Sequence, residues 1–187
     1  MGYGIKKAID HGYITRDKLW ITSKLWNTYH QYEHVELACK KSLVDLQLTY
    51  FDLYLIHFPI ALKYIPFDLK YPPEWTYYHD PPPHLTNDES SLSSSHLALP
   101  PRIELDMNAP LHLTWKGMEN LINQSKLTRY IGVCNFNVQL LMDLFSYAEI
   151  KPYMNQIELH PYLPQQVLVD FCHKYGIKCT AFSPLGR

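Results

Sequence analysis

Five short apolar segments, separated by helix-like stretches, constrain the fold of this chain more than any other feature. Near-continuous apolar runs of this length are typical of strands in a parallel sheet that is covered on both faces. We therefore predict an α/β fold with five parallel strands. The predicted strands span Leu19–Lys24, Phe51–His57, Tyr130–Asn135, Tyr153–Glu158 and Lys178–Ser183.

A polar side chain stands at or near the carboxyl end of each predicted strand: Lys24, His57, Asn135, Gln156 and Ser183. In a (β/α) barrel the catalytic groups lie at the C-terminal ends of the strands, whereas the rest of each strand packs in the core. We therefore expect these five side chains to form a ring at one mouth of a rolled sheet.

Helical patterns alternate with these strands and cover residues 4–12, 32–48, 115–126, 138–149 and 165–176. A full barrel has eight strands and roughly 250 residues, whereas this chain has 187 residues. The first pattern also begins without an N-terminal helix signal. We expect a single incomplete domain over residues 1–187, a partial (β/α)8 TIM barrel with about five of eight strands, truncated at both ends.

The segment 63–110 differs in composition from its surroundings. It contains Pro81–Pro83 and a serine-rich cluster at Ser90–Ser95, and it leaves the second strand shortly after His57. Proline removes backbone donors and serine-rich tracts bury little surface, so we predict an irregular insertion, part of it disordered. A loop or lid over a substrate pocket and a tolerated surface insertion are about equally favoured.

Composition argues against several classes of partner. The formal net charge is -1 and the isoelectric point is near 6.8, which leaves no basic stripe for nucleic acid. No apolar run approaches the roughly 18 residues of a membrane span, and no signal peptide is apparent, so we expect a cytoplasmic protein. We also expect a monomer or weak dimer. Cys39, Cys134, Cys172 and Cys179 are too widely spaced for a zinc motif and fit reduced thiols.

Five sequence stretches together carry a resemblance to a known family. They are LWITSKLWNTYHQYEHVELACKKSL, FDLYLIHFP, YIGVCNF, YMNQIELHPYLPQ and TAFSPLG. In this order they closely resemble the aldo-keto reductases, and in particular the branch of xylose and aldose reductases. The resemblance covers nearly the whole chain except the insertion. It implies a (β/α)8 barrel that reduces aldehydes and ketones, here aldoses or small carbonyl substrates, with NADPH or sometimes NADH.

The resemblance assigns catalytic roles to two of the residues at strand ends. Lys24 would lower the pKa of a catalytic tyrosine; from the residues alone, a lysine whose amine reaches out into water is an alternative. His57 would donate a hydrogen bond to the substrate carbonyl. Without the resemblance, a core histidine with satisfied hydrogen bonds would be favoured about two to one.

The resemblance also implies a set of cofactor contacts. Asn135 and Gln156 would each end a strand with a carboxamide and hold the nicotinamide carboxamide, whose donor and acceptor match an amide. Cys134 replaces a serine of the family, and its thiol is a weaker donor. A reactive thiol is the alternative at this position, although no activating base is evident.

Three residues near the end of the chain complete the implied cofactor site. Phe182 stands where the family usually has tyrosine, and its ring can still stack on the nicotinamide. Ser183 and Leu185 resemble the start of the loop that folds over the cofactor pyrophosphate.

The resemblance finally implies what the chain lacks. The aspartate and tyrosine of the family tetrad belong to a segment upstream of the first helix, and Tyr3 lies beyond the catalytic tyrosine position. We therefore expect the 187-residue chain to be inactive alone. The alternative function is that of a non-catalytic barrel fragment that binds another chain through open sheet edges.

Overall fold

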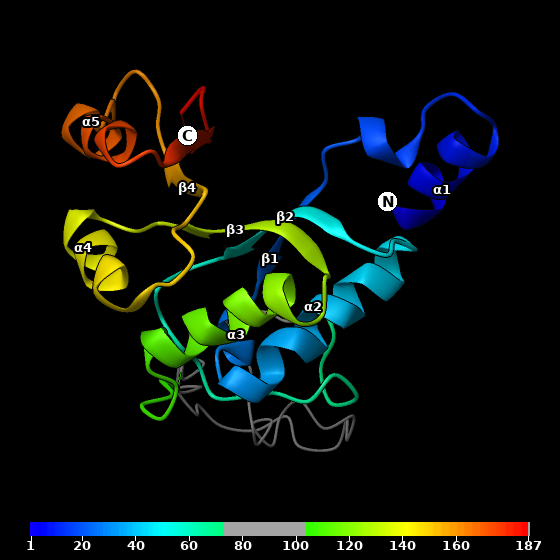
Figure 1. The fold of residues 1–187 in the computed structure, drawn as a ribbon, viewed down its shortest axis with the longest axis horizontal. Helices are drawn as coiled ribbons and strands as arrows, with labels where there is room; N and C mark the ends of the chain where they lie inside the picture. The colour runs from blue at the N-terminus through cyan, green and yellow to red at the C-terminus, as the bar shows by residue number, and fades with distance from the viewer. Residues whose placement is uncertain (73–103, 187) are drawn as a thin grey trace, which may run out of the picture.

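The computed structural model describes residues 1–72 and 104–186 and contains one five-stranded sheet. All strands are parallel and lie in the order β1-β2-β3-β4-β5, so strands that are neighbours in sequence are also neighbours in the sheet (Figure 1). This confirms the predicted α/β class. The strands are β1 Thr22–Leu25, β2 Phe51–Ile56, β3 Thr128–Cys134, β4 Met154–Glu158 and β5 Lys178–Phe182.

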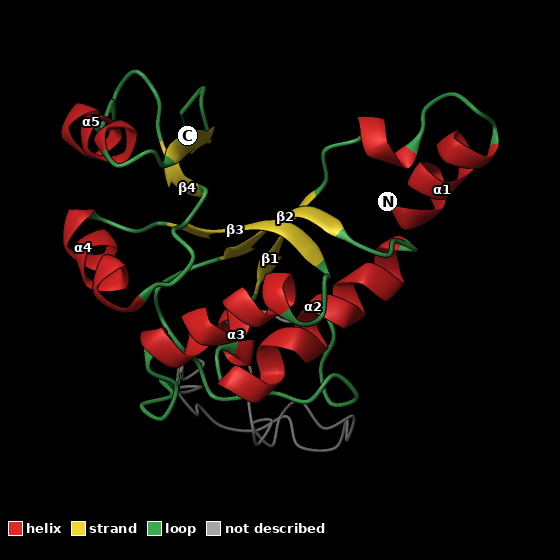
Figure 2. Ribbon diagram, viewed as in Figure 1, coloured by secondary structure: helices red, strands yellow, loops and turns green. Residues whose placement is uncertain are grey.

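Each predicted helix is present, and Figure 2 shows how helices alternate with strands along the chain. The α-helices are α1 Gly2–Asp10, α2 Tyr32–Leu46, α3 Leu111–Asn123, α4 Val138–Tyr147 and α5 Gln166–Lys174. Two short 3₁₀ helices, η1 Arg16–Lys18 and η2 Asn27–Tyr29, flank β1. Among the helices of the described residues, none has the length and hydrophobicity of a transmembrane span.

Two predicted starts, those of the third α-helix and the first strand, are wrong by three residues or more. The third α-helix begins at Leu111 instead of Trp115, because Pro110, with φ −68°, already has the backbone angle that suits a helix start. The first strand begins at Thr22 instead of Leu19. Leu19 is still occupied as the C-cap of η1, and its carbonyl accepts a hydrogen bond of 2.9 Å from Arg16.

The two faces of the sheet carry different side chains. Leu25, Ile56 and Val133 pack in the main core, against which α2 and α3 lie side by side (Figure 1). The alternate residues Leu53, Leu55 and Cys134 form a second, smaller cluster. Because successive side chains of a strand point to opposite faces, this second cluster marks the inner face of the sheet.

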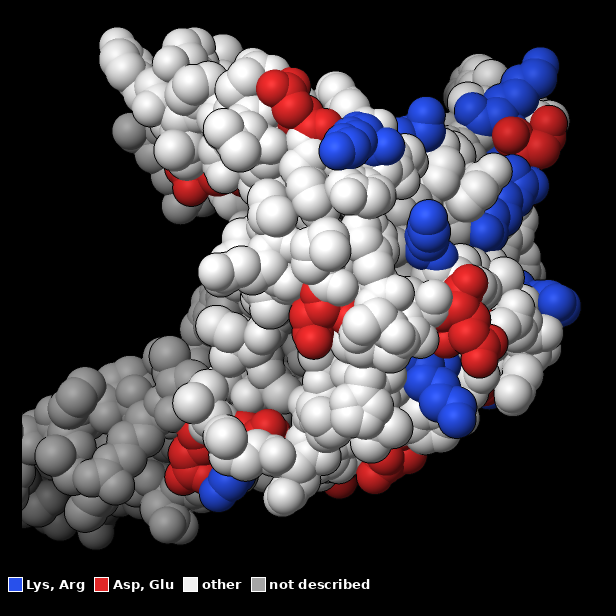
Figure 3. Space-filling view, turned by 60° about the vertical axis from the view of Figure 1, so that its left-hand side comes forward, with Lys and Arg blue, Asp and Glu red and all other residues white. Residues whose placement is uncertain are grey.

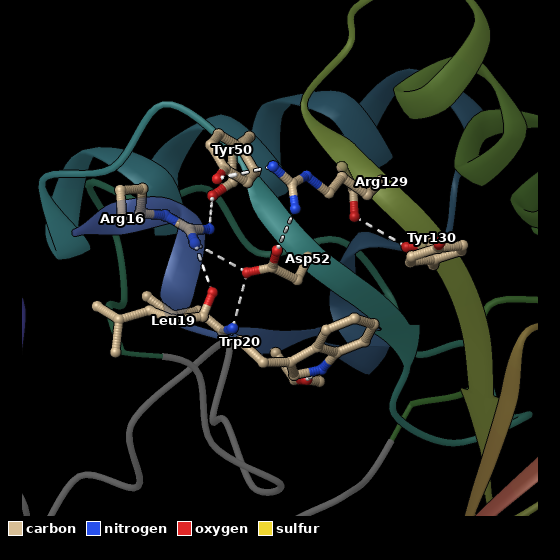
Figure 4. Close-up of polar contacts among 10 residues, drawn as sticks. Arg16, Leu19, Trp20, Tyr50, Asp52, Arg129 and Tyr130 are labelled. Carbon is tan, nitrogen blue, oxygen red and sulfur yellow. Dashed lines mark hydrogen bonds and ion pairs between the residues drawn. The ribbon is translucent and has the colours of Figure 1, made fainter. Parts of the chain in front are cut away.

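A buried carboxylate organises the opposite, N-terminal end of the strands (Figure 4). The Asp52 side chain is 1% exposed and accepts a hydrogen bond of 2.9 Å from the Ile21 amide. Its carboxylate also lies 2.9 Å from Arg16 and 3.3 Å from Arg129, and both guanidinium groups stack on the Tyr50 ring. This network joins β2 and β3 to the segment before β1, far from the predicted site. In the predicted barrel, residues at this N-terminal end of the strands serve stability.

The described ends of the predicted insertion lie next to each other. Leu62 and Leu105 form an antiparallel bridge, and the Lys63 amide donates to the Glu104 carbonyl at 3.0 Å. Apart from this bridge, residues 63–72 and 104–110 contain no helix or strand. The proline tract and the serine cluster fall in 73–103, outside the described residues, so the predicted irregular insertion stays a prediction there.

Candidate active site

Strand register brings the predicted site residues to one end of the inner face. Lys24 pairs with Leu55 across β1 and β2, and Cys134 pairs with Gln156 across β3 and β4. His57 directly follows β2, and its amide donates to the Leu25 carbonyl at 3.1 Å. Lys24, His57, Cys134 and Gln156 thus project from four neighbouring strands or strand ends on the same face of the sheet.

His57 is half-buried among aromatic side chains. The Trp26 ring packs edge-on against it with centroids 5.1 Å apart, and the Phe58 ring lies 5.4 Å away. Burial lowers the pKa of His57, and the nearby Lys24 ammonium lowers this pKa further. The imidazole is therefore neutral at neutral pH, so it retains one N–H that can donate a hydrogen bond.

Cys134 is almost fully buried beside Lys24. Burial raises the pKa of the Cys134 thiol to about 12, although Lys24 and the backbone of Gln156 act in the opposite direction. The thiolate, not the thiol, is the nucleophilic form of cysteine. A protonated thiol at neutral pH argues against the alternative of a reactive cysteine at this position.

The two carboxamides lie on adjacent strands, but only one of them ends its strand. Asn135 follows β3 in the left-handed region, with φ 63°, a conformation that asparagine tolerates better than most residues. Its amide donates to the Gln156 carbonyl at 2.9 Å, and its Nδ2 donates to the His57 carbonyl at 2.9 Å. Gln156 lies within β4, which continues to Glu158; the prediction that it ends the strand is wrong, because β4 still pairs with β5 at Glu158.

The remaining predicted residues lie further along the sheet. Phe182 pairs with Glu158, two positions beyond the pair of Gln156 with Thr180, so its side chain lies on the same face of the sheet as Gln156. Ser183, with φ 50°, begins a tight turn that is closed by a hydrogen bond of 2.8 Å from the Gly186 amide to the Ser183 carbonyl. Leu185 is 94% exposed at the tip of this turn and does not join the other residues.

Sequence reasoning missed two features of this end of the sheet. Trp26 forms one wall beside His57, and the only signal for it was its position just after Lys24. Glu158 and His160 form a pair, with 3.3 Å between Oε1 and Nε2. The two residues are separated by one position at the end of an apolar run, so in an extended chain their side chains lie on the same face. This spacing was the sequence signal that could have predicted the pair.

Two observations bear on whether nucleic acid or a metal ion could bind. Acidic and basic side chains are interspersed on the face drawn in Figure 3. Among the described residues, no group of three or more His, Cys, Asp or Glu side chains could hold a metal ion.

Known proteins of one family match almost the whole chain. Its family model, described as the aldo/keto reductase family, matches residues 4–187. A probable NAD(P)H-dependent D-xylose reductase of Aspergillus clavatus is 44% identical over 185 residues, which cover 99% of this chain and 49% of that protein. A 4-dihydromethyl-trisporate dehydrogenase of Mucor mucedo is 42% identical, covering 100% of this chain and 51% of that protein.

Solved structures agree with these sequence matches. The aldose reductase of Schistosoma japonicum superposes with a TM-score of 0.78 at 35% identity, covering 99% of this chain and 52% of that one. A Bombyx mori aldo-keto reductase in complex with NADP gives a TM-score of 0.75 at 37% identity, covering 99% of this chain and 48% of that one. The five-stranded sheet is therefore part of a (β/α)8 barrel, and the chain spans about half the length of the relatives it matches. The chain belongs to the aldo/keto reductase family.

Proposed function

We propose that this chain carries part of the site of an NADPH-dependent reductase that converts aldehydes or ketones to alcohols. The observation that carries the proposal is the convergence of Lys24, His57, Asn135 and Gln156 at one end of the inner sheet face. Because relatives of this chain are named as probable D-xylose reductases, we propose aldoses and small aldehydes as its substrates. A cytoplasmic location and a monomeric or weakly dimeric state stay predictions from the sequence.

The chemistry of the side chains supports a nicotinamide cofactor. Asn135 and Gln156 are joined by a backbone hydrogen bond of 2.9 Å, and the Asn135 side-chain carbonyl accepts no hydrogen bond from the described residues. A carboxamide ligand offers the complementary donor and acceptor. The Phe182 ring, on the same face, would stack on the nicotinamide, and Ser183 would lie toward the pyrophosphate. NADPH is the expected cofactor and NADH is possible; when bound, it supplies a hydride to the carbonyl carbon.

Residues of the chain would prepare the carbonyl for reduction. The neutral His57 imidazole would donate a hydrogen bond to the carbonyl oxygen and hold it in one orientation. The Lys24 ammonium, close enough to lower the pKa of His57, would stabilise the negative charge that develops on that oxygen. Trp26 and Phe58 shield the imidazole from water on two sides.

Titration of the purified chain with NADPH, followed by the fluorescence of the nucleotide, tests the proposal. We expect saturable binding that weakens roughly tenfold in Gln156→Leu, since a buried amide contact to the cofactor is lost. The control Gln139→Leu changes an exposed residue of α4 and should bind like the wild type. An absence of saturable binding by the wild-type chain would contradict the proposal.

A second assay tests the expectation that the 187-residue chain is inactive alone. Loss of NADPH absorbance is followed with xylose or a small aldehyde as substrate. NADPH binding without consumption agrees with a chain that carries only part of the site. Consumption above the rate without substrate would overturn the expectation of inactivity and would exclude the alternative of a non-catalytic fragment.

A further inference from the structure

His160 lies against the turn of residues 183–186, although it comes from a different loop. A Cβ atom added to Gly186 would lie 4.0 Å from the Nδ1 atom of His160. The pairing of Glu158 with Phe182 brings the ends of β4 and β5 together and so places the loop after β4 beside this turn. The same turn begins with Ser183 and contains Leu185, two of the predicted pyrophosphate contacts.

The backbone and one ring nitrogen of His160 are held firmly. Its amide and carbonyl exchange hydrogen bonds with Leu163 at 3.3 and 2.8 Å, which closes a tight turn after β4. The Nε2 atom lies 3.3 Å from Oε1 of Glu158, and the histidine side chain is only 12% exposed. The ring therefore has a defined position and one charged neighbour.

The other ring nitrogen is buried and has no hydrogen-bond partner in the described part of the chain. Because Nε2 faces a carboxylate, the neutral ring favours the tautomer in which Nε2 carries the proton and donates a hydrogen bond to Glu158. Nδ1 is then an acceptor. Buried polar atoms without partners are rare in proteins because they cost free energy, so an unpaired acceptor at this position requires an explanation.

We propose that His160 is a positioning residue of the cofactor site. When the turn of residues 183–186 closes over the pyrophosphate, Nδ1 accepts a hydrogen bond from an N–H or hydroxyl of that turn, and Glu158 fixes the tautomer that allows this. The Gly186 amide already donates to Ser183 and Pro184 has no N–H, so the Ser183 and Leu185 amides and the Ser183 hydroxyl are the candidate donors of this turn. The inference rests on the proposed function, since it takes a bound dinucleotide as the ligand that closes the turn.

Two substitutions of His160 separate the roles of the two ring nitrogens. An asparagine side chain places its amide near the position of Nδ1, whereas a glutamine side chain places its amide near Nε2. We expect His160→Gln to weaken NADPH binding roughly tenfold, and His160→Asn to stay within roughly threefold of the wild type. A merely structural role through Glu158 would give the opposite order. Thermal melting of each variant reports any general loss of stability separately.

The tautomer of His160 provides a second readout that does not depend on NADPH. Long-range ¹H–¹⁵N spectra of the wild-type chain should show the proton on Nε2. A proton on Nδ1, or equal NADPH affinities of the wild type and His160→Gln, would overturn the role of His160. An absence of NADPH binding by the wild-type chain would overturn the proposed function instead, so the two failures are distinct.

Discussion

Acidification should destabilise this fold, and the buried histidine His30 should make a large contribution to the loss. Its side chain is only 2% exposed, and its Nε2 atom has no hydrogen-bond partner among the described residues. Burial lowers the pKa of His30 from its ordinary value of 6.5 to about 4. The folded state therefore accepts only the neutral ring, whereas the unfolded chain takes up a proton readily.

The sign and size of the effect follow from these two pKa values. As the pH falls from 6.5 toward 4, the unfolded chain is protonated first, so the free energy of unfolding decreases. At about pH 5 the loss is about 2 kcal/mol, and it reaches about 3 kcal/mol once both states are protonated. A loss of this size is a large fraction of the stability of a typical domain.

Urea unfolding followed by tryptophan fluorescence, at about pH 7.5 and about pH 5, measures this loss. The wild-type free energy of unfolding should fall by about 2 kcal/mol more than that of His30→Gln between these conditions. His34 and His57, whose pKa values are also lowered by burial, contribute equally to both proteins. The control His11→Gln changes an exposed histidine and should keep the wild-type pH dependence. If His30→Gln loses as much stability as the wild type, the reasoning about His30 is wrong.

Three further predictions use other parts of the structure. Asp52→Asn removes a buried charge and should lower the free energy of unfolding by about 2–4 kcal/mol, whereas Asp68→Asn on the surface should change it by less than about 0.5 kcal/mol; equal effects would contradict the role of the carboxylate. Gly132→Ala places a Cβ 2.5 Å from a backbone oxygen of the neighbouring strand and should cost about 1–3 kcal/mol. A Cβ added at Gly4 meets no atom within 4 Å, so Gly4→Ala should stabilise α1 by up to about 1 kcal/mol. If the melting temperatures of Gly132→Ala and Gly4→Ala shift in the same direction, this contrast is refuted. Cys134→Ser supplies a stronger donor and should tighten NADPH binding by roughly threefold, and weaker binding would speak against a nicotinamide contact there.

The strands were predictable from sequence because each is an apolar run of the right length between helical patterns. Their ends were less predictable. Leu19 and Ile21 look like strand residues, but the Leu19 carbonyl accepts a hydrogen bond from Arg16 and the Ile21 amide donates to the Asp52 carboxylate, so this segment stays outside β1. The sequence also did not show which face of the sheet each β2 side chain lies on. All residues of Phe51–Ile56 are buried, so polar and apolar residues do not alternate along this strand.

The site was predictable only in part, because strand register is a long-range property. The positions of Lys24, His57 and Asn135 near strand ends follow from the local pattern. The end of β4 at Glu158 follows from the apolar run Tyr153–Glu158, but the pairing of Gln156 with Cys134 and Thr180 depends on strand register, which the local sequence does not reveal. His160 was missed because its importance comes from the approach of a separate turn, and no single stretch of sequence contains both.

The most direct test of the site is a map of amide chemical shifts in the ¹⁵N-labelled chain during titration with NADPH. If one end of the inner sheet face binds the nicotinamide, the amides of His57, Asn135 and Gln156 should shift together and saturate at one nucleotide concentration. The amide chemical shifts of Asp52 and Arg129, at the opposite end of the strands, should not change. Shifts confined to the Asp52 end, or none at saturating NADPH, would contradict the account.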